Sequence, residues 1–278
     1  MTKQNKRVIL VTGASRGVGK GIAEGIAQPG DIIICAARSM VEGTTVQQFG
    51  FEINSSLEDT VKNINEKGAQ GIPYEIDLNK PDEILNLATF VKEEFGCLDL
   101  LVHAACQIHD DLVTPKPYWE KSLDLWSVMD VGLKSNYFLS HALTPLMIES
   151  KGKLILQISS HGAMCYMHGP IYGAQKAAID KMAFDMAHDL KPFNICSLSL
   201  WSGIVKDEKT QKVSEQHGEQ YAEFLKGAAS QEYAGMVINE IYQDSEIMNF
   251  SGSTLIAAEI GDKYGIKDID SNSPQSDR

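Results

Sequence analysis

A glycine-rich turn near the start of the chain constrains the fold more than any other feature. An apolar run (VILV) leads straight into residues 12–19 (TGASRGVG), and helical periodicity follows as far as Gln28. Gly13 permits a tight turn, Gly17 lets a ligand approach the backbone, and Gly19 lets helix and strand pack closely. Because a helix N-terminus offers free N–H groups, the chain is expected to open with a strand, a phosphate-binding turn and a helix. A glycine-rich turn without a ligand is the simpler alternative.

Apolar runs of strand length recur along the rest of the chain and alternate with amphipathic stretches. Runs this apolar are typical of strands covered on both faces, as in a parallel sheet between two helix layers. The sequence therefore predicts a doubly wound Rossmann fold of the α/β class, with a seven-stranded parallel sheet flanked by helices. The expected strands are 8–11, 32–36, 71–76, 98–104, 153–158, 195–200 and 255–258, and the expected helices are 17–28, 57–67, 82–95, 119–149 and 172–190.

Three segments interrupt this alternation. Residues 39–56 form a long connection after the second strand, which suits either a substrate lid or a surface insertion. Residues 205–230 are polar and charged and follow the sixth strand. No linker separates two domains, so we expect one nucleotide-binding domain over residues 1–265 and a flexible tail over 266–278.

Charge and cysteine content exclude several classes of protein. The net charge of −12 disfavours nucleic acid as a partner. The five cysteines are scattered and odd in number, and the histidines lack metal-binding spacing. We therefore expect no disulfide framework and no metal site, in a reducing, cytoplasmic compartment. The polar start and the lack of an apolar run of about 20 residues predict neither a signal peptide nor a membrane span.

The glycine-rich turn has the spacing TGxxxGxG, and a second motif, YGAQK, occupies residues 172–176. Together with the chain length and the strand order, these motifs resemble the short-chain dehydrogenase/reductase family, from Arg7 to the region of the last strand. The resemblance implies an oxidoreductase that binds a nicotinamide dinucleotide. It also implies a homodimer or homotetramer, because the helices of 119–149 and 172–190 commonly pack against a second subunit in that family.

The charge around the second strand favours NADP(H) over NAD. The strand is followed by Arg38 without an acidic residue, and Arg16 precedes the second glycine of the turn. An arginine pairs with a 2′-phosphate, whereas an acidic residue binds a bare ribose diol. NADP-specific members of the short-chain dehydrogenase/reductase family, which this sequence resembles, carry basic residues at these positions. With the contacts that the resemblance implies, the predicted cofactor set is Gly13, Ser15, Arg16, Gly17, Val18, Gly19, Arg38, Asp77, Leu78, Ala104, Ala105, Tyr172, Lys176, Gly203 and Ile204.

Ser160, Tyr172 and Lys176 form the expected catalytic set. Tyr172 and Lys176 stand four residues apart near the start of a helix, so both lie on one face. A phenol is a poor acid–base catalyst at neutral pH, and a nearby ammonium stabilises its phenolate form. Ser160 ends the fifth strand, where a hydroxyl steadies a substrate oxygen as charge develops. Ser159 is the competing candidate, and the strand-end position favours Ser160.

The sequence departs from the family pattern at several positions. The Asn-Asn-Ala-Gly turn after the fourth strand reads HAAC at 103–106, and the family's catalytic Asn falls on Gly132. Glycine preserves a helix kink but holds no water through a side chain. Segments 131–134 (VGLK), 199–205 (SLWSGIV) and 263–270 (KYGIKDID) resemble the dehydrogenase/reductase SDR family member 1 branch. That resemblance implies that Gly132 is a trait of the branch rather than a sign of lost activity.

These features predict an NADP(H)-dependent oxidoreductase that transfers hydride between the nicotinamide and a carbonyl or secondary alcohol. His161, Met164, Tyr166 and Met167 suggest a partly apolar pocket for a small, hydrophobic substrate. Two alternatives stay open: a non-catalytic NADP-binding regulatory protein on the same fold, and a catabolic alcohol dehydrogenase. The sequence does not reveal the substrate, nor what replaces the amide missing at Gly132.

Overall fold

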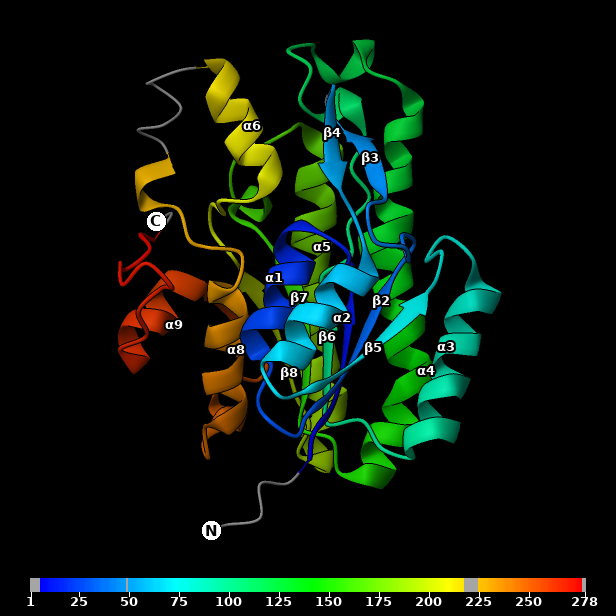
Figure 1. Ribbon diagram of the computed structural model, residues 1–278. Helices are drawn as coiled ribbons and strands as arrows, with labels where there is room; N and C mark the ends of the chain where they lie inside the picture. The colour runs from blue at the N-terminus through cyan, green and yellow to red at the C-terminus, as the bar shows by residue number, and fades with distance from the viewer. Residues whose placement is uncertain (1–5, 49, 218–224, 277–278) are drawn as a thin grey trace.

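The apolar runs assemble into one parallel sheet in the order β5-β2-β1-β6-β7-β8-β9 (Figure 1). The computed structural model describes residues 6–48, 50–217 and 225–276. Because strand order reverses between β1 and β6, their carboxyl ends open onto a crevice, the usual ligand position in such sheets. The predicted doubly wound, seven-stranded fold is confirmed. Its strands are β1 (Val8–Thr12), β2 (Ile32–Ala37), β5 (Gln70–Glu75), β6 (Leu100–His103), β7 (Leu154–Ser159), β8 (Cys196–Trp201) and β9 (Thr254–Ile256).

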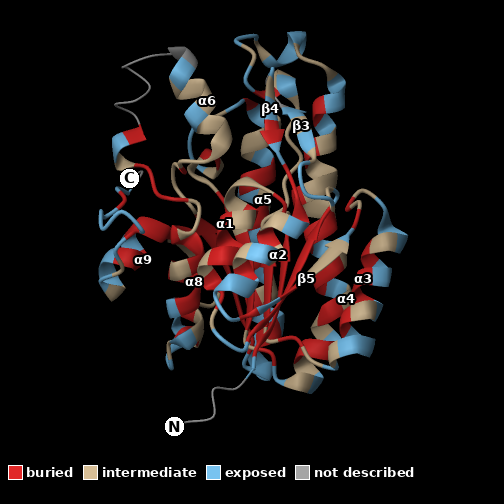
Figure 2. Ribbon diagram, in the orientation of Figure 1, coloured by how far each residue is buried: buried red, intermediate tan, exposed pale blue. Residues whose placement is uncertain are grey.

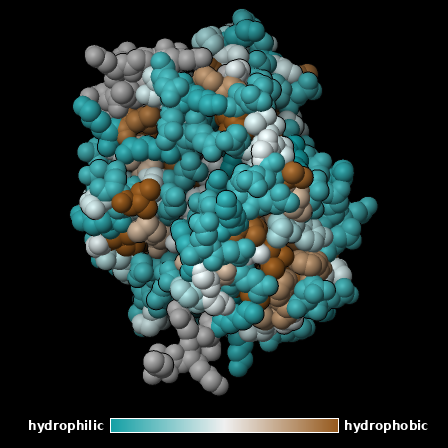
Figure 3. Space-filling view, in the orientation of Figure 1, coloured by the Kyte–Doolittle hydropathy of each residue, from teal (hydrophilic) through white to brown (hydrophobic). Residues whose placement is uncertain are grey.

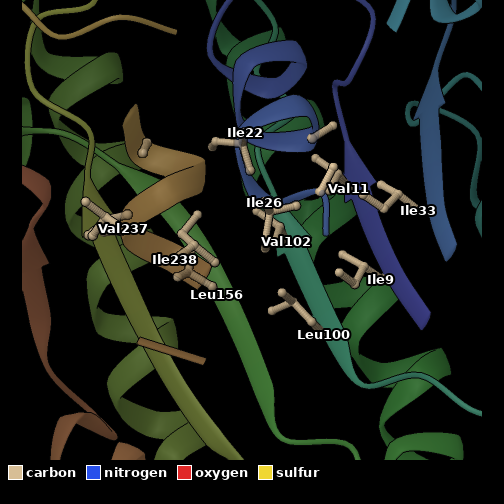
Figure 4. Packing of buried hydrophobic residues seen from close by; sticks show 14 of the residues in the cluster. Ile9, Val11, Ile22, Ile26, Ile33, Leu100, Val102, Leu156, Val237 and Ile238 are labelled. Atoms are coloured by element: carbon tan, nitrogen blue, oxygen red, sulfur yellow. The ribbon is translucent and has the colours of Figure 1, made fainter. Parts of the chain in front are cut away.

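Alternate residues of the strands pack against opposite helix layers, because successive strand side chains point to opposite faces. Ile9, Val11 and Leu156 pack with the helices of one layer, as Figure 4 shows for Ile22, Ile26, Val237 and Ile238. Figure 2 shows the resulting buried layer running along the sheet. Each fully buried aliphatic side chain contributes about 1.5–3 kcal/mol. The first layer holds α1 (Gly17–Ile26), α2 (Leu57–Glu66) and α8 (Tyr233–Gln243), and the second holds α3 (Pro81–Phe95), α4 (Ser135–Ser150) and α5 (Pro170–Leu190).

The long connection of residues 39–56 contains a β-hairpin outside the main sheet. Its strands β3 (Thr45–Gln48) and β4 (Phe51–Asn54) pair antiparallel with each other only. In Figure 1 the hairpin rises at the end of the molecule opposite the N-terminus, as does α6 (Glu208–His217). The Lys212 ammonium on α6 donates a hydrogen bond to the backbone carbonyl of Glu52 on β4. The two segments that interrupt the βα alternation therefore contact each other.

The single long helix expected over 119–149 is wrong. Short 3₁₀ turns occupy Tyr118–Glu120 and Leu123–Met129, a π-type turn covers Asp130–Lys134, and regular α-helix begins only at Ser135. The break falls at Val131, which is extended, and at Gly132, whose φ of 118° lies in a region that favours glycine. The helical periodicity of the sequence continues through the break, which is why periodicity alone did not locate it.

The C-terminal segment also differs in detail from the prediction. The last strand ends at Ile256 and α9 (Ala257–Tyr264) follows at once, although residues 255–258 were expected to be extended. Residues 266–276, expected to form a flexible tail, make specific contacts. The buried Asp268 carboxylate accepts hydrogen bonds from the backbone N–H and the hydroxyl of Ser230, and the Gln275 N–H donates to the Gly227 carbonyl. These contacts hold the segment against residues 225–230.

The face of the molecule seen in Figure 3 is predominantly hydrophilic, with separate small hydrophobic areas. This agrees with the net charge of −12. Within the described residues no helix is both long enough and apolar enough to cross a membrane. Within the same residues, His, Cys, Asp and Glu side chains form no group of three that is suited to a metal ion.

Candidate active site

The glycine-rich turn between β1 and α1 leaves no room for a side chain at Gly13 or Gly19. A Cβ atom on Gly13 would lie 2.7 Å from the Cα of Ala105, and one on Gly19 would lie 2.2 Å from the carbonyl oxygen of Gly13. Gly13 and Gly17 have φ angles of 74° and 53°. At its three glycines the turn thus offers bare backbone, and it leads into the N-terminus of α1. Such a surface lets phosphate groups approach the N–H groups of the first helical turn.

A cleft of about 200 Å³ lies over this turn, along the carboxyl edge of the sheet. Most of the predicted cofactor residues line it: Gly13, Ser15, Arg16, Gly17, Val18, Gly19, Arg38, Asp77, Leu78, Ala104 and Ala105. The other four, Tyr172, Lys176, Gly203 and Ile204, do not line it. Ile53, Gln107, Ile108, Val131 and Asp207 line the cleft as well, and the predicted cofactor set omitted them. Ile53 comes from the hairpin and Asp207 stands directly before α6, so both interrupting segments border the cleft.

Arg16 and Arg38 bring two positive charges to one side of the cleft. Burial, and next the charge of Arg38, lower the pKa of the Arg16 guanidinium, while Asp207 counteracts them. Burial alone would raise the pKa of Asp77, but hydrogen bonds from Asn79 and the charge of Arg38 leave it lowered. Two guanidinium groups that repel each other are stabilised when an anion lies between them. Arg16 and Arg38 thus make this side of the cleft positively charged.

The hairpin segment is tied to the glycine-rich turn through Ser55. The Ser55 hydroxyl donates to the hydroxyl of Ser15 over 3.1 Å and accepts from Nη1 of Arg16 over 3.0 Å. Ser55 is fully buried, and the next N–H, that of Ser56, donates to the Ser15 carbonyl over 3.0 Å. Ser55 thus fixes where the Arg16 guanidinium lies. Sequence reasoning missed Ser55, because its only local signal is the adjacent Ser56, which caps α2.

Ser160 and Tyr172 meet at the end of β7. The Ser160 hydroxyl lies 3.1 Å from the Tyr172 hydroxyl, and it accepts a hydrogen bond from the Gly162 N–H over 3.3 Å. Gly162 allows this approach, since a Cβ there would lie 2.7 Å from Cε1 of Tyr172. Ser159, the competing candidate, is buried and donates to the Lys176 carbonyl over 3.1 Å. The geometry thus supports Ser160 rather than Ser159 as the hydroxyl beside the phenol.

Lys176 lies one helical turn after Tyr172 on α5. Its ammonium is 5.5 Å from the centre of the Tyr172 ring and donates to the Ile158 carbonyl over 3.4 Å. The side chain is buried, at 6% exposed. A buried ammonium beside a phenol stabilises negative charge on the phenol oxygen. The three predicted catalytic side chains are therefore brought together.

A histidine ring packs against Tyr172. The His168 ring contacts the Tyr172 ring edge to face at 5.1 Å. Burial, and then the charges of Lys209 and Lys121, lower the pKa of His168. Met164 and Tyr166, expected as an apolar pocket wall, are 79% and 83% exposed. His168 therefore borders Tyr172, and the two lysines lie near His168.

This chain is similar in sequence and in fold to known proteins. The family model described as short chain dehydrogenase matches residues 7–218. Human dehydrogenase/reductase SDR family member 1 is 31% identical over 277 residues, which cover 96% of this chain and 84% of that protein. NADPH- and L-sorbose-bound L-sorbose reductase from Gluconobacter frateurii superposes with a TM-score of 0.72 at 22% identity, covering 90% of this chain and 94% of that chain.

A second solved structure differs in its cofactor. The 3-oxoacyl-[acyl-carrier protein] reductase from Brucella melitensis, in complex with NAD, superposes with a TM-score of 0.75 at 20% identity, covering 92% of this chain and 96% of that chain. At these identities the superpositions establish the fold alone.

Proposed function

Because this chain belongs to the short-chain dehydrogenase/reductase family, and is thus an oxidoreductase by family, we propose that it uses NADP(H) to interconvert a carbonyl group and an alcohol. The observation that carries the proposal is the contact of the Ser160 and Tyr172 hydroxyls at 3.1 Å, with the Lys176 ammonium beside the same ring. A phenol held between a hydroxyl and a buried ammonium is suited to donate a proton to a substrate oxygen.

Arg16 and Arg38 support NADP(H) as the cofactor. Their two guanidinium groups border the cleft and interact unfavourably with each other, so an anion placed there lowers the free energy of the site. The 2′-phosphate distinguishes NADP from NAD, and arginine pairs with phosphate through parallel N–H donors. Ser55 keeps the Arg16 guanidinium in place. The bare turn from Gly13 to Gly19 is suited to the pyrophosphate.

The residues of the chain divide the reaction between them. NADPH, when bound, supplies the hydride that reduces the carbonyl carbon. Ser160 donates a hydrogen bond to the substrate oxygen and steadies the charge that develops there. Tyr172 gives its hydroxyl proton to that oxygen, and Lys176 stabilises the phenolate that remains. In the direction of alcohol oxidation the same groups act in reverse, with Tyr172 as the base.

The approach to Tyr172 bears on the substrate. Tyr166 and Met164 offer exposed apolar surface, which agrees with a small and partly apolar carbonyl compound. Lys121 and Lys209 lie close enough to His168 to lower its pKa, so a polar group on the substrate also finds partners there. We further propose a homo-oligomer, since Tyr137 on α4 and Phe184 on α5 are more than half exposed, at 51% and 58%.

The experiment follows NADPH and NADH oxidation by the full chain against a panel of aliphatic and aromatic aldehydes and ketones and keto acids. We expect turnover of at least one carbonyl compound, with NADPH preferred over NADH. Tight NADPH binding without turnover of any compound would contradict the proposal and favour a non-catalytic NADP-binding protein. A preference for NADH would contradict the role given to Arg16 and Arg38.

A further inference from the structure

The backbone break before α4 lies directly against the catalytic turn of α5. At the break, Val131 is extended and Gly132 has a φ of 118°. The Val131 carbonyl therefore leaves the helical hydrogen-bond ladder, and it accepts instead from the Gln107 N–H over 3.3 Å. Val131 and Gln107 both line the nucleotide cleft. A carbonyl turned out of a helix in this way needs partners from elsewhere in the fold.

Gln175 supplies such a partner from α5. Its Nε2 donates to the carbonyl of Val128 and, over 3.3 Å, to the carbonyl of Val131. Its Oε1 accepts from the Cys106 thiol over 3.8 Å. The side chain is fully buried, at 0% exposed, so water does not reach its polar atoms. These atoms therefore depend on hydrogen bonds within the protein. One carboxamide thus joins the break to both the turn after β6 and the catalytic helix.

Gly132 makes the space that the Gln175 carboxamide occupies. A Cβ atom on Gly132 would lie 2.7 Å from Nε2 of Gln175, closer than non-bonded atoms approach. The glycine is therefore needed for a second reason besides its φ angle. Any side chain at position 132 and the Gln175 carboxamide exclude each other.

We propose that Gln175 is a positioning residue of the proposed reaction, which holds the catalytic turn of α5 in register with the backbone break that borders the cofactor. The amide missing at position 132 is thus present at the same turn, delivered from the facing helix. This inference rests on the proposed function. It assigns to Gln175 no contact with substrate or cofactor.

The placement of Gln175 explains how it acts on the catalytic residues. It precedes Lys176 directly and follows Tyr172 by three residues, so all three lie within one turn of α5. Val128, whose carbonyl it binds, belongs to the small buried cluster against which Tyr172 packs. Without the carboxamide, Tyr172 and Lys176 lose their fixed position relative to Val131 and hence to the cleft. A small displacement at a reacting centre lowers turnover more than it lowers ligand binding.

The first test is Gln175→Met, which keeps the side-chain volume and removes the donor. We expect kcat to fall roughly 10- to 100-fold, as for a misplaced catalytic group, while the Kd for NADPH changes less than about twofold. The matched control is Ser197→Ala, because the buried Ser197 hydroxyl also donates to a backbone carbonyl of α5, that of Ala183. The control should lower thermal stability and leave kcat unchanged. An unchanged kcat in folded Gln175→Met, or a parallel loss of kcat and NADPH affinity, would overturn the inference.

The second test is a double-mutant cycle, which compares the kcat of the wild type, the two single variants and the double variant, each checked for folding by thermal denaturation. Gly132→Ala should lower kcat roughly 10-fold or more in the wild-type background, because its Cβ displaces Gln175. In the Gln175→Ala background the same change should cost at least about threefold less than in the wild type, since the space is then free and only the cost of the φ angle remains. If the glycine matters only for its φ angle, the fold-loss in kcat of the double variant equals the product of the two single fold-losses. That independent behaviour would refute the pairing of Gly132 with Gln175.

The two tests separate this inference from the proposed function. Wild-type turnover that Tyr172→Phe abolishes and Gln175→Met leaves intact would remove only the inference. A wild-type protein that binds NADPH but reduces no carbonyl compound would remove the proposed function, and the inference would fall with it.

Discussion

The nucleotide cleft and the reaction site adjoin at Val131, yet they are assembled in different ways. In the cleft, the turn from Gly13 to Gly19 is one continuous segment, and backbone atoms exclude a side chain at Gly13 and at Gly19. At the reaction site, Ser160 and Tyr172 come from different elements, and Gln175 reaches across 44 positions of the sequence to Val131. Local backbone geometry thus shapes the glycine-rich turn, to which Ser55 adds a contact that holds Arg16, whereas contacts between separate elements assemble the reaction site. Substitutions should therefore separate cofactor binding from turnover.

Tyr172→Phe should give the largest effect and should fall on the reaction site alone. Removal of the hydroxyl abolishes proton donation, so we expect kcat to fall about 10²- to 10⁴-fold, the usual contribution of general acid catalysis. The Kd for NADPH should stay within about twofold, because the cleft residues are unchanged. Steady-state kinetics and fluorescence titration measure the two quantities.

The matched control for this change is Tyr242→Phe. Tyr242 lies near the end of α8 beside Arg7 and Lys153 and does not line the cleft, so loss of its hydroxyl should leave kcat unchanged. If Tyr172→Phe turned over carbonyl compounds as fast as the wild type, the phenol would not be the proton donor. A large loss of NADPH affinity would instead show that the two regions are not separable at this residue.

Arg38→Asp should affect the cleft and spare the chemistry. The change removes a guanidinium partner of the 2′-phosphate and adds a carboxylate that suits a ribose diol. A hydrogen bond to a charged group contributes about 1.5–3 kcal/mol, so the preference for NADPH over NADH should fall roughly 10- to 150-fold. The ratio of kcat/KM for the two cofactors is the measurement.

A charge-matched control for Arg38→Asp lies far from the cleft. Lys92 is exposed near the end of α3, and Lys92→Asp alters the net charge equally. It should leave the cofactor ratio unchanged. An unchanged ratio in Arg38→Asp would contradict the role given to this arginine.

Ser55→Ala should give a smaller effect, again on the nucleotide cleft. The hydroxyl holds Arg16 from the residue after the hairpin, so its loss leaves the guanidinium present and less well placed. Because only the placement of the guanidinium suffers, NADPH affinity should fall about fivefold, equivalent to about 1 kcal/mol, and NADH affinity should stay constant. Equal losses for both cofactors would indicate that Ser55 supports the whole cleft rather than the 2′-phosphate side.

His103→Asn should affect neither site, and its effect falls on stability alone. Burial lowers the pKa of His103 to about 3, from 6.5 in the unfolded chain. Between pH 6.5 and about 3 the unfolded chain binds a proton at His103 and the folded chain does not. The free energy of unfolding therefore falls as pH falls from 6.5 toward 3. Between pH 7.5 and 5.5 the wild type should lose about 1.4 kcal/mol more free energy of unfolding than the variant. Equal losses in urea denaturation would contradict the buried, neutral histidine.

The sequence was sufficient for the parts of the molecule whose signals are local. The strand-forming runs, the turn at 12–19 and the pairing of Tyr172 with Lys176 all follow from spacing within a few residues. The break at Gly132 was implied only by the family resemblance, because helical periodicity continues through it and the Gln175 carboxamide that contacts it lies on another helix. The hairpin of β3 and β4 escaped prediction for a similar reason, since Ser55 and Lys212 hold it through contacts distant in sequence.

Hydride transfer is the claim on which the account rests, and isotope transfer tests it most directly. NADPH carrying deuterium at both C4 positions of the nicotinamide is incubated with the full chain and a carbonyl compound that the chain reduces, and the product alcohol is examined by mass spectrometry. The account predicts deuterium on the former carbonyl carbon in the wild type and a loss of product formation in Tyr172→Phe. Consumption of NADPH without deuterium in the product would contradict it.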